Sequence, residues 1–364
     1  MKAITYVLEK YNHPLVRREI EIPALSQGQV LVKLLASGIC GSDLHMWKGE
    51  DPRLRLPMAL GHEGVGTVAG LNGPRYTVNG EAIREGDLII WNRGVSCGRC
   101  YYCAVLHEPS FCRERKVHGI NLTLSDAPYL NGCYADHLIL PERTDILKLP
   151  AGIDPGVLVA ASCSGATAAH GFDIVRPEPG DTVVVIGPGP LGLFAVALAK
   201  AYGASNIILT GSSESRLKLG EEFGAAMVLN RKFISLDERK TRILELTGGR
   251  GGDLIIEASG TTAGLQEAIS LARVGGTVLN VGMSQPAGTF PLDGFADLTR
   301  RNLRLQGVWV SDTCHLYRAA ELVLNQTDLF AKLVTDRFRL SQVNHALEAM
   351  ERKEAVKAIL LPEE

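Results

Sequence analysis

Four cysteines lie close together in the first third of the chain, and their spacing is typical of a metal site. They follow the pattern C-x2-C-x2-C-x8-C, as Cys97, Cys100, Cys103 and Cys112. Four thiolates at this spacing suit a tetrahedral Zn²⁺ ion, and four protein ligands leave no open position for a substrate. We therefore expect a structural zinc site here. The alternative is a pair of disulfides in a secreted protein, but clustered cysteines in a chain without export features more often bind metal.

A second, scattered set of residues could hold a catalytic metal. Cys40 lies in the segment GICGSD, His62 in GHEG and Cys163 in AASCSG. Two thiolates and one imidazole leave the fourth position of a zinc ion open, which is the pattern of alcohol-oxidising zinc enzymes. If the three residues do not meet in space, they are ordinary small core residues.

A glycine-rich turn predicts a dinucleotide site. The segment is Gly187-Pro188-Gly189-Pro190-Leu191-Gly192. It follows an apolar run expected to be a buried strand and opens an apolar-periodic helix, as the G-x-G-x-x-G motif requires. Gly187 permits the tight turn, Gly189 lets backbone N–H groups approach a pyrophosphate, and Gly192 lets the helix approach the sheet.

The end of the next predicted strand favours NADP over NAD. An NAD enzyme usually places Asp or Glu there for the ribose 2′-hydroxyl, whereas this chain has Gly211. No carboxylate would then repel a 2′-phosphate, and Ser212, Ser213 and Arg216 could donate hydrogen bonds to it. NAD stays open, because Glu214 could bind the ribose and a basic residue at 216 can also serve an NAD enzyme.

The composition is that of an ordinary globular protein and excludes several partners. The chain has 364 residues, 46% hydrophobic and 21% charged, with a net charge of -2. That balance offers no basic surface for nucleic acid or an anionic membrane, and no apolar run is long enough to span a bilayer. The N-terminus has no signal-peptide pattern. With six of the eight cysteines given a metal role, we expect a reducing compartment, most simply the cytoplasm.

The surrounding pattern predicts two kinds of domain. The first 160 or so residues are rich in short β-branched runs, with a hairpin at 76–83 turning on Asn79-Gly80, and indicate a partly barrel-like β domain. From about residue 179, short apolar strands alternate with helix-length segments, which indicates a doubly wound parallel sheet. We expect its strands at 183–186, 206–209, 226–229, 254–257, 277–281 and 303–310, and helices at 191–202, 214–223, 236–247 and 263–273. Helices at 316–324 and 343–350 and a strand at 357–361 should pack back on the first domain.

Taken together, these motifs resemble the zinc-dependent medium-chain dehydrogenases of the alcohol, polyol and threonine dehydrogenase kind. The resemblance runs nearly end to end and implies a GroES-like catalytic domain, residues 1–165 and 312–364, around an inserted Rossmann domain, residues 166–311. It implies two zinc ions per chain and hydride transfer between NAD(P)⁺ and a secondary alcohol, polyol or sugar, giving a ketone or aldehyde. It also implies a homodimer or homotetramer that pairs sheet edges, for which 303–310 is a candidate strand.

The resemblance assigns roles to residues around the catalytic metal. Cys40, His62 and Cys163 match the zinc ligands, and Glu63 matches the acidic neighbour that sits behind the metal or enters its coordination shell. Asp43 matches the carboxylate that orients the ligand histidine; such partners typically matter 10–100-fold.

Further residues match the proton path and the cofactor contacts. Ser42 matches the hydroxyl that bonds the reacting alcohol, and His45 the outer member of the proton relay. Thr167 falls where the nicotinamide is contacted, and Lys357 where a basic side chain reaches the pyrophosphate. Arg93 lies on a loop that, by the resemblance, faces the substrate and could bind an anionic group, although a surface or salt-bridged arginine is the more ordinary interpretation.

Two departures from the family pattern and three other functions stay open. Polyol and threonine relatives often have Glu in place of Cys163, and the interval between Cys103 and Cys112 is one residue longer than usual. A non-catalytic nucleotide-binding protein could keep the same fold, and so could a zinc-free quinone or enoyl reductase, although those lack the ligand set. A dehydrogenase for a phosphonate-related or cyclic alcohol is a further possibility.

Overall fold

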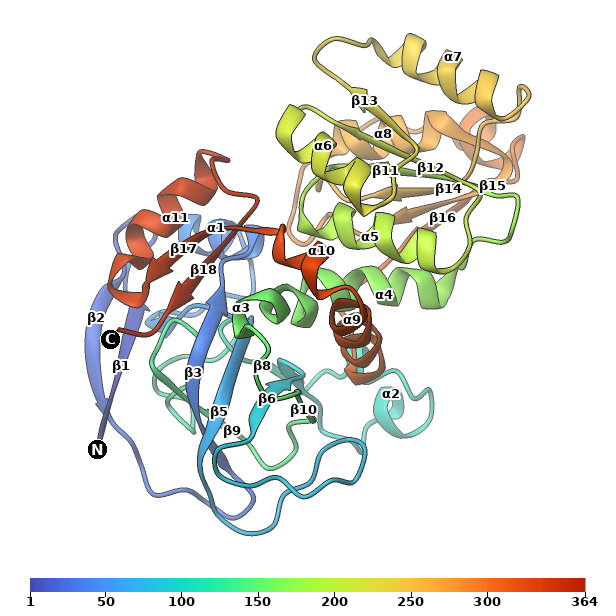
Figure 1. Cartoon of the computed structure of the whole chain (residues 1–364). Helices are drawn as coiled ribbons and strands as arrows, with labels where there is room; N and C mark the ends of the chain where they lie inside the picture. The colour runs from blue at the N-terminus through green and yellow to red at the C-terminus, as the bar shows by residue number, and fades with distance from the viewer. Residues whose placement is uncertain (364) are drawn as a thin grey trace. The chain divides into compact units, whose positions relative to one another are not determined.

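The computed structural model describes residues 1–363, which fall into two compact units (Figure 1). Unit 1 consists of residues 1–163 and 311–363, and unit 2 of residues 164–310. The junctions expected from the sequence, 165/166 and 311/312, lie within two residues of these. Among the described residues, no helix is both long and apolar enough to cross a bilayer.

Unit 1 is built from sheets whose strands pair antiparallel, except that β17 pairs with β18 in parallel. The largest has the order β10-β6-β5-β3-β18-β17, with β9 also paired to β3; a second has the order β2-β1-β4, and β7 pairs with β8. The strands are β1 (Lys2–Leu8), β2 (Val16–Glu21), β3 (Val30–Gly38), β4 (Met58–Ala59), β5 (Gly64–Leu71), β6 (Leu88–Trp91), β7 (Gly94–Val95), β8 (Lys116–Val117), β9 (His137–Leu140), β10 (Ile146–Lys148), β17 (Val334–Arg339) and β18 (Lys357–Leu361). Because β18 pairs with β3, the C-terminal segment completes the first sheet, as expected.

Short helices cover this framework. They are α1 (Gly41–Lys48), α2 (Tyr101–Ala104), α3 (Pro155–Leu158), α9 (Thr313–Asn325), α10 (Thr327–Ala331) and α11 (Val343–Glu351). The main apolar core joins both ends of the chain, since Leu8 and Met58 pack in one cluster with Leu347 and Leu360. Residues far apart in sequence are therefore held in one rigid frame.

Unit 2 is a parallel sheet with the order β13-β12-β11-β14-β15-β16, the order of a dinucleotide-binding fold. Its strands are β11 (Thr182–Ile186), β12 (Asn206–Gly211), β13 (Met227–Asn230), β14 (Gly252–Glu257), β15 (Ala272–Asn280) and β16 (Arg304–Gly307). β11 and β14 are buried along their whole length, so their continuous apolar runs reflect a sheet covered on both faces.

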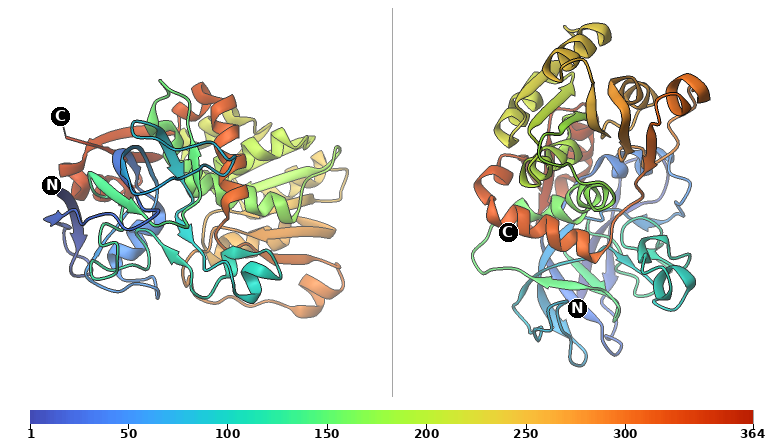
Figure 2. Two further views of the ribbon diagram at one scale, coloured as in Figure 1. Left: turned by 90° about the horizontal axis from the view of Figure 1, so that it is seen from below. Right: turned by 90° about the vertical axis from the view of Figure 1, so that its right-hand side faces the viewer.

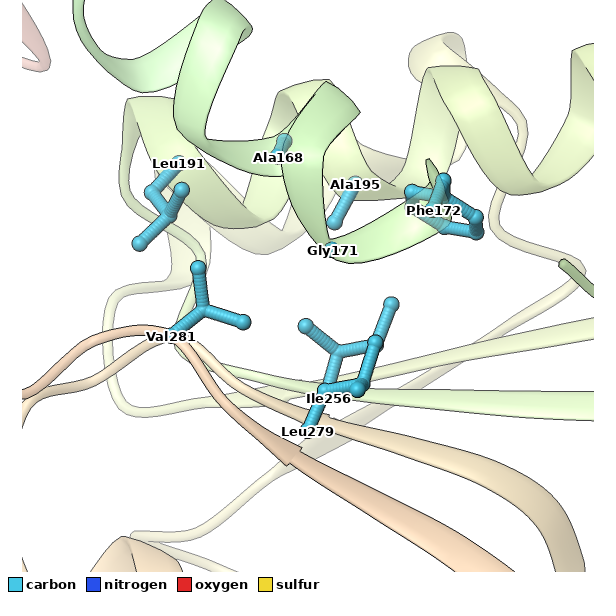
Figure 3. Close-up of a pocket in the computed structure, with 8 residues that line it drawn as sticks. All are labelled: Ala168, Gly171, Phe172, Leu191, Ala195, Ile256, Leu279 and Val281. Carbon is cyan, nitrogen blue, oxygen red and sulfur yellow. The ribbon is translucent and has the colours of Figure 1, made fainter. Parts of the chain in front are cut away.

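Helices cover both faces of this sheet, as Figure 2 shows. They are α4 (Ser164–Ile174), α5 (Pro190–Ala201), α6 (Glu214–Phe223), α7 (Leu236–Leu246) and α8 (Thr262–Leu271). α4 packs on α5, which contacts α6, while α7 packs on α8. Figure 3 shows α4 and α5 above the sheet, where Ala168, Gly171 and Ala195 are small enough to bring the helices close to Ile256 and Leu279.

The predicted elements are present, with shifted ends. The predicted helix at 263–273 ends at Leu271 because Ala272 already has an extended backbone and begins β15. The strand predicted at 303–310 is shorter, Arg304–Gly307. The hairpin at 76–83 forms, with Tyr76 bridged to Ala82 and Gly80 in the left-handed region. Helix α1, which carries part of the site, was not predicted.

Candidate active site

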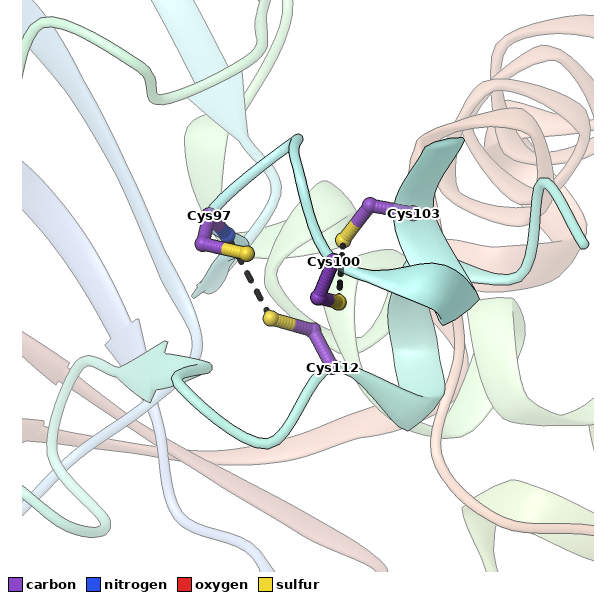
Figure 4. Close-up of side chains that lie close together, drawn as sticks. All are labelled: Cys97, Cys100, Cys103 and Cys112. Atoms are coloured by element: carbon purple, nitrogen blue, oxygen red, sulfur yellow. Dashed lines mark hydrogen bonds between the residues drawn. The ribbon is translucent and has the colours of Figure 1, made fainter. Parts of the chain in front are cut away.

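The four clustered cysteines converge on one point of unit 1 (Figure 4). Their sulfurs lie within 4.8 Å of one another, and all four are free thiols. The Sγ atoms of Cys100 and Cys103 are 3.5 Å apart, and the amide of Cys97 donates to Cys112 Sγ at 3.3 Å. This donor set fits a tetrahedral zinc ion. Between Cys103 and Cys112, His107 takes a left-handed backbone conformation.

The scattered ligand candidates also converge, in the same unit. Cys40, His62, Glu63 and Cys163 offer ligand atoms that lie within 4.8 Å of one another. Cys40 Sγ is 3.8 Å from Cys163 Sγ. His62 Nε2 is buried and has no hydrogen-bond partner, so the set contains a ring nitrogen that nothing in the described part of the chain satisfies. A metal ion bound between the two thiols would be coordinated by this unpartnered nitrogen.

Asp43 fixes the orientation of this imidazole. It lies in the first turn of α1, where its carboxylate accepts from the Cys40 amide at 2.8 Å and faces His62 Nδ1 at 3.1 Å. Burial lowers the pKa of His62, but the charge and hydrogen bond of Asp43 outweigh it and raise that pKa to about 9. With Nδ1 held as the proton-bearing nitrogen, Nε2 is left to bind a metal.

Ser42 and His45 lie on the same short helix as Asp43. Ser42 Oγ is 3.8 Å from Cys40 Sγ, next to the ligand set. His45 is one turn further along α1, pairs with Glu50 and is partly exposed. Residues three apart face the same side of a helix, so α1 presents a hydroxyl near the ligands and an imidazole near solvent.

Lys357 lies in the core of unit 1. Its side chain is 1% exposed, forms an ion pair with Glu63 and donates from Nζ to the carbonyl of Ile39 at 3.0 Å. Its expected contact with a pyrophosphate stays a prediction. Lys357 neutralises Glu63, whose Oε1 has no hydrogen-bond partner.

The glycine-rich turn in unit 2 has the shape that a dinucleotide requires. Gly187 ends β11 with a φ of 111°, and a Cβ on Gly192 would lie 1.8 Å from the Gly187 carbonyl oxygen. Gly189 caps α5, and a Cβ there would meet nothing within 4 Å. The open space over Gly189 fits a pyrophosphate, and Pro190 and Leu191 form the first turn of α5 beside it.

The residues expected to select the cofactor lie together at the end of β12. A Cβ on Gly211 would lie 2.4 Å from Pro188 Cγ, so this position admits no carboxylate without movement of the turn. Ser212 is exposed, Ser213 precedes α6, and Arg216 lies half-buried in its first turn. Thr167 lies on α4, half-buried.

Sequence reasoning missed the buried surroundings of Cys163. Arg93 Nη1 donates to the carbonyl of Ser162 at 3.0 Å, and Arg93 is only 5% exposed. His118 lies opposite Arg93 and is also buried. No spacing rule links these residues, because their approach depends on how β7 pairs with β8.

Comparison with known proteins agrees with this geometry. Residues 26–151 match the family model of the alcohol dehydrogenase GroES-like domain, and residues 190–325 that of zinc-binding dehydrogenase. The chain belongs to the zinc-dependent medium-chain dehydrogenases. It is a zinc- and NAD(P)-dependent oxidoreductase of alcohol and carbonyl substrates.

The relatives cover the whole chain. The 5-exo-hydroxycamphor dehydrogenase of Pseudomonas putida is 32% identical over 94% of both chains. A crystal structure of an alcohol dehydrogenase from Thermotoga maritima is 47% identical over 100% of both chains, with a TM-score of 0.96. A zinc-binding dehydrogenase from Sinorhizobium meliloti, whose crystal structure was solved bound to NADP, is 27% identical over 100% of both chains, with a TM-score of 0.86. GroES-like and Rossmann folds, expected from the sequence, are thus confirmed.

Proposed function

We propose that this dehydrogenase oxidises a secondary alcohol, polyol or sugar to a ketone or aldehyde, prefers NADP⁺, and holds two zinc ions per chain. The observation that supports it most is the convergence of Cys40, Cys163 and the unpartnered Nε2 of His62. Three ligands leave a coordination position open for a substrate, whereas the four-cysteine set is closed and serves structure.

The chain's own residues supply orientation and a path for the proton. A zinc ion in the three-ligand set supplies Lewis-acid chemistry, which favours loss of the substrate's hydroxyl proton. Ser42 is positioned to accept that proton, and His45, one turn away and partly exposed, to release it to solvent. Asp43 keeps His62 in the tautomer that binds metal.

Metal content and turnover together test this function. Purified protein should contain two zinc ions per chain and reduce NADP⁺ at 340 nm with members of a panel of alcohols, polyols and sugars. One zinc ion and no turnover would instead favour the non-catalytic nucleotide-binding protein. A zinc-free active protein would favour the quinone or enoyl reductase alternative.

The preference for NADP⁺ rests on the end of β12. The Sinorhizobium meliloti relative binds NADP, and here no carboxylate occupies position 211. Ser212→Asp would place a negative charge beside the ribose, so it should shift the ratio of kcat/KM for NADP⁺ over NAD⁺ toward NAD⁺ by about 10-fold or more. A wild-type protein that strongly prefers NAD⁺ would contradict the proposal.

We also propose that the chain forms a homodimer or homotetramer, and that the protein lies in the cytoplasm. The oligomer is supported by the exposed edge strand β16. The compartment is supported by the thiol clusters, which bind metal only when reduced.

A further inference from the structure

The β7–β8 ladder holds Arg93 beside the three-ligand set of unit 1 and places His118 opposite Arg93. Arg93 immediately precedes β7 and His118 immediately follows β8. The amide of His118 donates to the carbonyl of Arg93 at 3.0 Å, which extends the β7–β8 ladder by one residue pair. Paired residues of an antiparallel ladder project from the same face. The two side chains therefore point the same way, and both are buried, at 5% and 1% exposure.

Arg93 is directed at a metal ligand. Its Nη1 donates to the carbonyl of Ser162, the residue before Cys163. Burial lowers the pKa of Arg93, but the charges of Cys163 and Cys40 and a hydrogen bond with Cys163 raise it above its ordinary value. A charged guanidinium thus lies within reach of two of the three ligands.

No carboxylate of the described chain pairs with this guanidinium. Glu63 is committed to Lys357, and Asp43 to His62. Arg115 adds a second positive charge nearby, since burial and then the charge of Arg93 lower the pKa of Arg115 to about 10. Glu63 also acts on Arg93 through its charge, but it is the ion-pair partner of Lys357.

A divalent ion held by two thiolates and a neutral imidazole would form a neutral set, which would offer the buried guanidinium of Arg93 no counter-charge. A buried charge without a counter-charge is unfavourable. A guanidinium binds carboxylates through two parallel hydrogen bonds, so an anionic group on the substrate would supply the missing charge.

His118 offers an additional hydrogen bond. Both of its ring nitrogens are buried and lack partners in the described part of the chain. Burial lowers its pKa to about 4, so the ring is neutral at physiological pH and keeps one N–H donor and one acceptor.

We propose that the substrate is an alcohol with a carboxylate close to the reacting carbinol, a hydroxy acid or sugar acid, and that Arg93 anchors this carboxylate while His118 hydrogen-bonds a polar group beside it. The inference rests on the proposed dehydrogenase function and names its substrate class.

Matched substrates and one substitution test the anchor. Two pairs of substrates share a carbon skeleton and differ in that one member carries a carboxylate where the other carries a hydroxymethyl group. They are gluconate with sorbitol, and lactate with 1,2-propanediol. We expect kcat/KM of the wild type to favour at least one acid over its neutral partner by about 100-fold. Arg93→Met should remove that preference by lowering kcat/KM for the acid much more than for its neutral partner, and Arg93→Lys should restore part of the preference. Arg99→Met, at an 81% exposed side chain of the cysteine lobe, is the control and should change neither.

A binding measurement separates the anchor from catalysis. 2-Hydroxyisobutyrate has a tertiary hydroxyl that cannot be oxidised, so its affinity for the zinc-loaded protein can be measured by calorimetry. We expect Arg93→Met to weaken its binding by at least 10-fold while the zinc content stays unchanged.

Several outcomes would overturn the inference. Equal use of acids and neutral alcohols by the wild type would do so while leaving the proposed function intact, and absence of turnover with every substrate would instead remove the proposed function. Loss of zinc from Arg93→Met would show that Arg93 holds the metal set and not a substrate. A clear preference for glycerol phosphate or 2-hydroxyethylphosphonate over the acids would overturn the assignment of a carboxylate.

Discussion

At the residue scale, the chemistry of the site depends on which atoms lack protein partners. His62 Nε2 is the buried nitrogen left open between two thiols, and Asp43 fixes it there. The backbone of Cys40 also bonds Asp43, so one carboxylate positions two of the three ligands. Substitution of a ligand residue should therefore weaken metal binding much more than it lowers the stability of the fold.

Cys40→Ala tests the ligand set at this scale. The variant should lose one of two zinc ions and at least 100-fold in kcat, while its affinity for NADP⁺ stays within about threefold, because the nucleotide turn lies in unit 2. Elemental analysis, steady-state kinetics and cofactor titration measure these three quantities. Cys133→Ala is the matched control, since Cys133 is completely buried but outside both metal clusters, and it should keep both ions. Unchanged kcat in Cys40→Ala would refute the assignment.

The buried His118 predicts a pH dependence of stability. Burial lowers its pKa to about 4 in the folded protein, whereas the pKa of a histidine in an unfolded chain is about 6.5. Between these values the unfolded chain binds the additional proton, so the free energy of unfolding falls as the pH is lowered from about 6.5 to 4, by up to about 3 kcal/mol.

His118→Gln should remove that contribution. Urea unfolding at pH 7.5 and 5.0, with zinc in excess, should show a loss on acidification that is about 2 kcal/mol smaller in the variant than in the wild type. His13→Gln, at an exposed position, should behave as the wild type. Equal pH dependence in both variants would mean that His118 is solvated in solution.

At the element scale, the turn between β11 and α5 separates a glycine needed for folding from one needed for binding. A Cβ on Gly192 would overlap the Gly187 carbonyl, whereas a Cβ on Gly189 would project into open space. Gly192→Ala should therefore lower the melting temperature. Gly189→Ala should leave it within about 2 °C but weaken dinucleotide binding by about 10-fold or more, because the methyl group would occupy the pyrophosphate position.

The control for this pair is Gly294→Ala, also in open space but far from the turn in sequence. It should change neither quantity. Thermal melts and titration of NADPH fluorescence measure both. Tight NADPH binding by Gly189→Ala would show that the turn does not hold the pyrophosphate.

Elements with a local signal were predictable from the sequence, and long-range contacts were not. The parallel strands of unit 2 show as buried apolar runs, and the cysteine lobe and the glycine turn depend on spacing within a few residues. Lys357, in contrast, bonds a carbonyl 318 residues away, and its direction follows from the pairing of β18 with β3. Helix α1 was missed because its eight residues, GSDLHMWK, begin at a glycine and carry no apolar period.

At the scale of the whole molecule, unit 1 carries both thiol clusters and unit 2 carries the nucleotide turn. Each metal set is complete within unit 1, so neither depends on the placement of the two units. The four-cysteine set is formed by a loop of sixteen residues, 97–112, with little regular structure of its own, and a metal is therefore expected to order it.

Association between copies of the chain can be tested at the edge of the unit 2 sheet. β16 pairs with β15 on one side only, all four of its residues are exposed, and Leu305 and Trp309 expose 39% and 42% of their surface. An unprotected edge strand with apolar side chains is a template for pairing with a second copy. The Val308 amide donates to the Asn280 carbonyl of β15, so the alternate amides of this strand, including that of Leu305, face the free edge. Leu305→Pro removes one of these outward donors, so it should shift the protein to monomers in sedimentation velocity at micromolar concentration.

The opposite edge of the same sheet supplies the control. Phe233 follows β13, the other edge strand, and is 76% exposed. Phe233→Lys should leave the sedimentation coefficient unchanged. A wild type that sediments as a monomer, or a Leu305→Pro variant that keeps the wild-type mass with native helicity, would exclude β16 as the interface. In that second case the interface between the copies must lie elsewhere on the molecule, and β16 would be an edge strand too short to pair with a second copy.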